Sequence, residues 1–339
     1  MDLAIASSTG FEPDARGHRI LACIGRTPRD EECLAYAISL ARALASTLTL
    51  VHVMQPRGAP AGTHTDALDW EIARQDARTY VEGLQRSAVL ALGRPVAVRI
   101  EQGHAAERIV ALGGELGADL TVLGSHHARD ASASSLGSTV QQVVAVARGS
   151  VFIAHAAASG RIAASVRRII VPLDGSLRTE SVLPIAVRVA RGYHAELVLV
   201  HLVEELAPTL VLRDEEDLAL ARRLMVRLEA NGGAYLEGLR ARLARDGLAV
   251  RTLVARHANP RRGILETSAR ERADLIIVSA HGAACDAGRM FGSVAEYVLA
   301  HATAPLLILQ DLQETEMLAP GHGDEWSPPL RASYAPELA

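Results

Sequence analysis

The chain carries an internal repeat, and this constrains its fold more than any other feature. Residues 119–155 and 274–310 show the same order of small, apolar and glycine positions at one constant offset. Such self-similarity indicates a duplicated structural unit, and 339 residues are enough for two domains. The chain is therefore predicted to contain two copies of one α/β domain. The aligned positions are Asp119 with Asp274, Gly124 with Ser279, Gly137 with Gly292 and Ser138 with Ser293.

Each copy alternates short apolar segments with helical patterns. Strands are predicted over 19–24, 48–54, 96–101, 119–124 and 151–155, and again over 168–173, 197–203, 249–254, 274–279 and 305–309. Helices are predicted over 30–45, 66–92, 105–117 and 138–148, and over 177–191, 213–245, 261–272 and 293–302. A break or kink is expected where Asn231-Gly232-Gly233 interrupts the long second helix.

This alternation predicts a doubly wound α/β fold, with a parallel sheet covered by helices on both faces. Ligands of such sheets bind at the carboxyl ends of the strands. The predicted domains are 18–156 and 166–310, with a small-residue linker over 156–165. Residues 311–339 contain acidic, Pro and Gly residues and are predicted to form a disordered tail.

Composition excludes several classes of protein. All 35 basic residues are Arg and there is no Lys, which excludes the P-loop, the kinase strand lysine and a pyridoxal Schiff base. The net charge of −4 is spread without long runs, so neither nucleic acid nor a membrane surface is an expected partner. The three Cys include no C-x-x-C pair, and no leader or apolar run of 18 residues is visible. We expect a cytoplasmic protein without a zinc site.

Residue Asp174 follows a predicted strand directly and is a candidate binding residue. A carboxylate at that strand end could accept hydrogen bonds from ribose hydroxyls or a purine edge. Alternatively, Asp174 or Ser176 simply caps the next helix. The end of the second strand of the same copy, at Val203, could present backbone groups to an adenine edge, which is an argument from topology alone.

A second candidate element combines two glycine positions with a helix start. Gly282 is followed by nine residues and then by Gly292 and Ser293. Glycines let backbone amides approach phosphate oxygens closely, and the start of a helix attracts anions. Alternatively, Ser293 and Glu296 form an S-x-x-E capping box.

These residues resemble the nucleotide motif of the universal stress protein family, G-x2-G-x9-G-S/T with an Asp after the first strand. The second copy matches it at Gly282, Gly292, Ser293 and Asp174, while Ser279 replaces the first Gly of the motif. The segments SAHG and FGSV also look like the family. The resemblance covers about residues 18–310, in the tandem form of the family.

The resemblance implies a five-stranded parallel sheet of order 3-2-1-4-5 in each domain, paired with its neighbour through the fifth strands. That pairing would be intramolecular here, and a further homodimer of the chain is left open. The resemblance also implies ATP binding with Mg2+ or Mn2+, as in some members. The nucleotide-binding residues are then expected to be Asp174, Val203, Ser279, His281, Gly282, Gly292, Ser293 and Val294.

The first copy departs further from the motif. Ile24 stands where the second copy has Asp174, and His127 stands where it has Gly282. An apolar side chain and an imidazole at these positions should block ATP. The first domain is therefore predicted to support folding and assembly. His52 and His201, at equivalent places in the second strands, are expected to serve packing and hydrogen bonding rather than catalysis.

The sequence therefore predicts a non-enzymatic stress-response sensor or adaptor whose second domain binds ATP. No general base is visible beside the predicted phosphate site. The alternative is a nucleotide-free structural or interaction module of the same fold, favoured by Ser279 and His127. A nucleotide-dependent adenylating enzyme is a third hypothesis, but it would want a different Gly-rich loop where this copy reads PLDGSLRTE.

Overall fold

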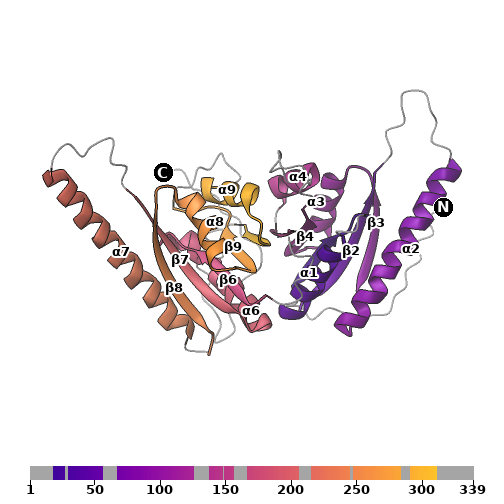
Figure 1. Ribbon diagram of the computed structural model, residues 1–339. Coiled ribbons are helices and arrows are strands. Elements are labelled where there is room, and N and C mark those ends of the chain that lie inside the picture. Colours follow the sequence, from indigo (N-terminus) through magenta and orange to yellow (C-terminus); the bar gives the residue numbers. More distant parts are fainter. Residues whose placement is uncertain are drawn as a thin grey trace, which may run out of the picture.

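A single ten-stranded sheet runs through the whole molecule (Figure 1). The computed structural model describes residues 18–26, 30–55, 67–125, 137–147, 149–155, 166–205, 215–244, 247–283 and 291–310. The strand order is β3-β2-β1-β4-β5-β10-β9-β6-β7-β8. Each half of this sheet has the predicted order 3-2-1-4-5, and all strand pairs within a half are parallel.

The strands lie close to their predicted positions. In domain 1, the first half of the sheet, they are β1 Arg19–Cys23, β2 Thr47–Met54, β3 Ala97–Gln102, β4 Leu120–Gly124 and β5 Ser150–Ala154. In domain 2, the second half, they are β6 Arg168–Pro172, β7 Glu196–Glu204, β8 Val250–His257, β9 Leu275–Ser279 and β10 Leu306–Leu309. The central strands of both halves are buried because helices cover both faces.

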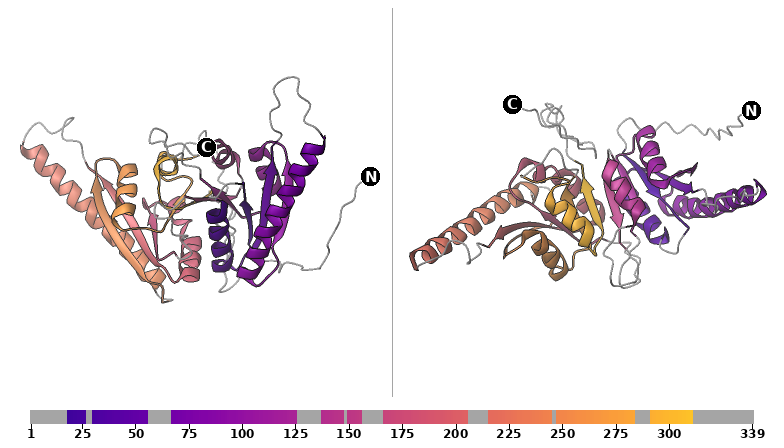
Figure 2. Two further views of the ribbon diagram at one scale, coloured as in Figure 1. Left: turned by 45° about the vertical axis from the view of Figure 1, so that its right-hand side comes forward. Right: turned by 90° about the horizontal axis from the view of Figure 1, so that it is seen from above.

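The helices form two layers. One face of the sheet carries α1 Asp30–Ala43, α2 Ala67–Leu92, α6 Leu183–Tyr193 and α7 Glu215–Leu243, and the other carries α3 Ala105–Glu115, α4 Ser138–Val146, α8 Pro260–Arg270 and α9 Ser293–His301. The long helices α2 and α7 lie at opposite ends of the molecule (Figures 1 and 2). The predicted doubly wound α/β architecture is therefore confirmed.

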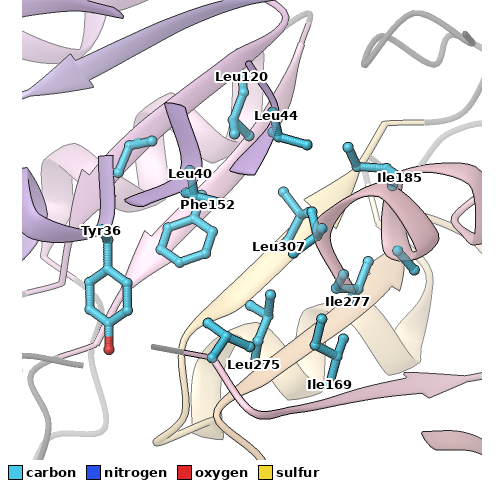
Figure 3. Packing of buried hydrophobic residues seen from close by; sticks show 14 of the residues in the cluster. Tyr36, Leu40, Leu44, Leu120, Phe152, Ile169, Ile185, Leu275, Ile277 and Leu307 are labelled. Atoms are coloured by element: carbon cyan, nitrogen blue, oxygen red, sulfur yellow. The ribbon is translucent and has the colours of Figure 1, made fainter. Parts of the chain in front are cut away.

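The two domains join through their fifth strands. Strands β5 and β10 pair antiparallel, with Phe152 opposite Leu307, and both side chains are fully buried. Beside them, α1 packs on α6 so closely that a Cβ on Gly192 would lie 2.5 Å from the carbonyl oxygen of Ala43. Residues of both domains share one hydrophobic core on each face of the sheet. Figure 3 shows part of the core on the face that carries α1 and α6. The expected intramolecular pairing is present, and neither core belongs to one domain alone.

The predicted helix over 177–191 is wrong, because the structure divides it. A short helix, α5, spans Leu177–Glu180, and α6 begins at Leu183. Pro184 lies in the first turn of α6, where its missing N–H costs no helical hydrogen bond. Proline also disfavours helical backbone in the residue before it, so a helix starts here more readily than it passes through.

The predicted break at Asn231-Gly232-Gly233 is also wrong, since α7 is continuous from Glu215 to Leu243. A Cβ on Gly232 would lie 2.5 Å from Cδ2 of the His201 ring on β7. The glycine therefore serves the close approach of helix and sheet, which a helical propensity argument does not consider. The neighbouring Gly233 has open space where its Cβ would be.

Some predictions fall outside the described residues: the linker over 156–165, the tail over 311–339, and His127. In the part of the chain that the structure describes, no helix combines the length and the apolar character needed to span a bilayer.

Candidate functional site

Domain 2 has a cavity of about 190 Å3 at the carboxyl ends of β6, β7 and β9. This is the edge of a parallel sheet where ligands are expected. The cavity brings together all of the predicted nucleotide residues except Val203. They are Asp174, Ser279, His281, Gly282, Gly292, Ser293 and Val294.

The carboxylate of Asp174 connects the loop after β6 to the loop after β9. Its Oδ1 accepts hydrogen bonds from the Ser176 amide at 2.9 Å and from the Thr179 hydroxyl at 2.8 Å. Its Oδ2 accepts one from the Ala283 amide at 2.8 Å. Asp174 remains solvent-exposed, so its oxygens can accept further bonds from a ligand.

These bonds also set the charge of Asp174. Partial burial would by itself raise the pKa of this carboxyl group, but the hydrogen bonds from Ser176, Ala283 and Thr179 outweigh it, and the pKa lies below its usual value. Asp174 is therefore ionised at neutral pH and acts as a hydrogen-bond acceptor.

The two glycines of the motif differ in how closely they are surrounded, and Gly282 is the crowded one. A Cβ on Gly282 would lie 2.7 Å from Oδ2 of Asp174, and a Cβ on Gly292 would lie 3.4 Å from Cα of His281. The Gly292 amide donates to the Ala280 carbonyl at 2.8 Å, which joins the start of α9 to the end of β9. The spacing of the glycines thus brings two loops and a helix start together at the carboxylate.

The first motif position accommodates Ser279 because the serine hydroxyl makes a local hydrogen bond. Its hydroxyl donates to the carbonyl of His281 at 2.5 Å, which closes a turn inside the loop. The side chain is nearly buried and still lines the cavity. The cavity therefore persists although a side chain has replaced bare backbone.

The start of α9 differs from the capping-box alternative. Gly292, not Ser293, is the N-cap residue, and within the described residues no side-chain hydrogen bond caps the helix. Ser293 is the first helical residue and is exposed at the cavity. The first amides of a helix have no intrahelical partners, so they are available to a bound anion. The capping alternative holds at Ser176 instead, whose hydroxyl accepts from the Thr179 amide at 3.3 Å.

Apolar walls of the cavity come from residues that the sequence did not single out as ligand contacts. Val200 and Leu202 project from β7, and Pro260 and Ile264 from the first turns of α8. Val203 is buried and does not line the cavity, because alternate strand residues face opposite sides of a sheet. That alternation, counted from the buried positions of β7, is the signal that could have identified Leu202. A role for the backbone of Val203 stays a prediction.

Comparison with known proteins agrees with this geometry. The profile of the universal stress protein family matches residues 17–155 and again 165–310. The chain belongs to the universal stress protein family. No curated protein matched the chain.

Solved structures show the same fold at low identity. A universal stress protein from Archaeoglobus fulgidus DSM 4304 is 16% identical, with a TM-score of 0.60 over 86% of this chain and 95% of its own. A functionally unknown protein from Pseudomonas aeruginosa PAO1 is 15% identical, with a TM-score of 0.59 over 87% of this chain and 93% of its own.

The paired histidines of the two universal stress protein domains serve structure, as predicted. His52 donates from Nδ1 to the Ile24 carbonyl at 2.8 Å, and His201 donates in the same way to the Leu173 carbonyl at 2.8 Å. Each bond ties the second strand of a domain to the loop after its first strand. Ile24 is therefore the counterpart of Leu173, and the residue that matches Asp174 is Gly25. The predicted alignment of Asp174 with Ile24 is wrong by one residue.

Domain 1 of this universal stress protein retains the equivalent cavity, at about 260 Å3. Ile24 is buried and forms part of its wall without closing it. The other wall residues correspond to those of domain 2 in position, with Val53 in place of Leu202 and Ile109 in place of Ile264. The prediction that domain 1 excludes ATP therefore rests on the chemistry of the wall and not on a lack of space.

Proposed function

We propose that this universal stress protein binds ATP in the cavity of domain 2 and passes the bound state on to a partner as a stress-response sensor or adaptor. One observation carries the proposal. The exposed carboxylate of Asp174, apolar walls and the uncapped start of α9 meet around one cavity. These are the three kinds of surface that the sugar, base and phosphates of a nucleotide require.

The size and walls of the cavity suit the base. A cavity of about 190 Å3 is somewhat larger than the roughly 150 Å3 that holds a benzene ring, and so accommodates a purine rather than a whole ATP. Val200, Leu202 and Ile264 would lie against the ring faces. Asp174, ionised and exposed, would accept from ribose hydroxyls or an exocyclic amine.

The phosphates would extend toward Gly282, Gly292 and the first amides of α9. No group of three His, Cys, Asp or Glu that could hold a metal ion occurs within the described ranges. The Mg2+ or Mn2+ that accompanies ATP would therefore be coordinated mainly by phosphate oxygens and water, as is usual for Mg2+. The chain would then supply the amides that balance the remaining charge.

We further propose that the protein responds to nucleotide without turning it over. Among the residues that the structure describes, the titratable side chains in the cavity wall are Asp174 and His281. Asp174 is a weak base because its hydrogen bonds favour the ionised form. A general base needs a pKa near the working pH, which Asp174 does not have.

Calorimetric titration of Mg-ATP into the full chain tests the binding. We expect one site per chain, lost in Asp174→Ala and kept in Gly25→Ala, the change at the matching position of domain 1. Thermal melts of both variants establish that they are folded. Binding that persists unchanged in Asp174→Ala would remove the nucleotide from this cavity. Sustained ATP hydrolysis that disappears in the same variant would contradict the non-enzymatic part.

The nucleotide-free module is the second candidate, and two observations favour it. Ser279 puts a side chain into the cavity wall, and three protein donors already bond Asp174. The melting temperature with and without Mg-ATP separates the candidates. A ligand at 100 times its dissociation constant adds about 2.7 kcal/mol to stability. An unchanged melting temperature at millimolar Mg-ATP would favour the module without nucleotide.

A further inference from the structure

The cavity of domain 1 occupies the same place in the fold as the cavity of domain 2 but has a different chemistry. None of the described residues that line it carries a carboxylate, a guanidinium or an imidazole. Its walls are aliphatic and come from β1, β2, β4, α3 and α4. They are Ile24, Val51, Val53, Ile109, Leu123 and Val140.

Among the described residues of this wall, the titratable group is the thiol of Cys23, and it is neutral. Cys23 lies in the wall, and burial, together with the nearby Cys33, raises the pKa of its thiol well above the usual value. Cys33 in turn contacts the carbonyl oxygen of Cys23 at 3.6 Å through its sulfur. A protonated thiol adds polarizable surface and no charge.

Among the described lining residues, the polar side chains lie at the mouth of the cavity. Gln55 follows β2, and Ser138 and Thr139 begin α4. These side chains offer hydroxyl and amide hydrogen bonds to a neutral polar group. A ligand with a full charge would lose its hydration here, and the described lining residues offer no oppositely charged side chain to replace that hydration.

We propose that domain 1 binds an uncharged, mainly apolar carbon compound that carries one small polar group at the end facing α4. The volume of the domain 1 cavity, about 260 Å3, exceeds the roughly 150 Å3 that holds benzene. It therefore suits a compound of about ten non-hydrogen atoms. Gly25 occupies the position of the Asp174 carboxylate, so the described wall has no acidic group there, and this gives the site its preference for an uncharged ligand. The chain then has two ligand sites of unlike chemistry on one sheet. This site does not depend on nucleotide binding in domain 2.

A pair of probes that differ in charge tests the proposal. We would titrate the full chain with 1-naphthol, which is neutral at pH 7, and with 1-naphthoate, which is anionic. We expect one naphthol site per chain and at least tenfold weaker binding of naphthoate. Equal affinity for the two probes, or no binding of naphthol, would overturn the proposal.

Matched cavity-filling variants locate the site. Ala105 lies in the first turn of α3 at the cavity wall, and Pro260 has the same place in domain 2. We expect Ala105→Trp to weaken naphthol binding at least tenfold and to leave Mg-ATP binding as it is in the wild type. Pro260→Trp should keep naphthol binding. The opposite pattern would place naphthol in domain 2 and contradict the proposal.

A second filling variant guards against misfolding of the first. Thr139→Phe fills the same cavity from α4, where Thr139 is partly exposed and has room to change. Both variants should lose naphthol while their thermal melts stay cooperative. If the wild type binds naphthol but does not bind Mg-ATP, only the nucleotide proposal is contradicted. Retention of naphthol by two folded variants would contradict only this one.

Discussion

Domains 1 and 2 have the same strand order and the same hydrogen bond from a histidine on the second strand, yet the cavities at their strand ends differ in chemistry. In domain 2 a carboxylate, Asp174, faces the start of an uncapped helix. In domain 1 the matching residue is Gly25, and the cavity has a larger volume and described walls that are mainly aliphatic. The comparison teaches that the scaffold forms the cavity, while the residue in the loop after the first strand makes the two cavities chemically different.

The largest expected effect concerns the contact that holds the two domains together. In Gly192→Ala the new Cβ would lie 2.5 Å from the Ala43 carbonyl oxygen and 2.6 Å from its Cα, atoms that cannot rotate away. Overpacking of this kind lowers the free energy of unfolding by about 1–3 kcal/mol, and we expect the upper end because backbone is involved. Denaturant unfolding measures it.

Gly114→Ala is the matched control for that change. Gly114 lies within α3 and has open space around the site of a Cβ. Alanine there should raise stability by up to about 1 kcal/mol through helix propensity. If Gly192→Ala also raises stability, α1 and α6 do not pack as closely as the structure shows.

A smaller effect is expected in the two long helices, where a Gly→Ala substitution should lower the free energy of unfolding in α7 and raise it in α2. Gly232→Ala in α7 pushes a Cβ into the His201 ring, which its bond to the Leu173 carbonyl holds in place, and should cost about 1–2 kcal/mol of unfolding free energy. In α2 of the other domain, the nearest atom to a Cβ on Gly83 is the end of Arg86 at 4.0 Å, so Gly83→Ala should stabilise by up to about 1 kcal/mol. If both substitutions change the free energy of unfolding in the same direction, the two helices approach the sheet equally closely.

At the site itself we expect a difference in ligand binding rather than in folding. Gly282→Ala puts a Cβ 2.7 Å from Oδ2 of Asp174 and must displace that carboxylate or its loop. Affinity for Mg-ATP should fall about tenfold, which equals about 1.4 kcal/mol. Gly124→Ala in domain 1 meets only an ordinary contact of 3.7 Å with Cys33 and should leave the titration unchanged. Equal losses in both variants would contradict the assignment to domain 2.

The smallest effect is a dependence on pH that domain 1 should lack. The pKa of Asp174 is lowered in the folded protein, so the stability that its hydrogen bonds give is present above its unfolded pKa and is lost as pH falls through the folded value. The difference in stability between the wild type and Asp174→Asn should be constant near neutral pH and shrink below about pH 4. Ile24→Asn should show no such trend. A constant difference for Asp174→Asn down to low pH would mean that the carboxylate is not held ionised.

The sequence predicted the fold because repeat, strand spacing and apolar patterning are local features that agree with one another. It also predicted where Asp174, Gly282, Gly292 and Ser293 lie, since the carboxyl ends of parallel strands share one edge of the sheet. It failed where contacts between distant elements decide. The role of Gly232 depends on a ring from β7, and the apolar wall at Leu202 and Pro260 depends on how α8 packs.

The volume of the domain 1 cavity could not be predicted from the sequence either. The sequence comparison matched Ile24 with Asp174 and predicted that its side chain blocks ATP. In the structure Gly25 matches Asp174, and Ile24 forms part of the wall of a cavity that persists. Side-chain identity gives chemistry directly, whereas free volume depends on the backbone positions of several elements at once.

The most direct test of the difference between the domains is photolabelling of the full chain with Mg-8-azido-ATP, followed by mapping of the labelled peptides by mass spectrometry. The azide is carried by the purine and so reacts with residues beside the base. We predict labelled peptides from β7 and α8, around Val200, Leu202 and Ile264, and their loss when unmodified ATP competes. Labelling around Val51, Val53 and Ile109 in domain 1 that is suppressed by unmodified ATP would contradict the account.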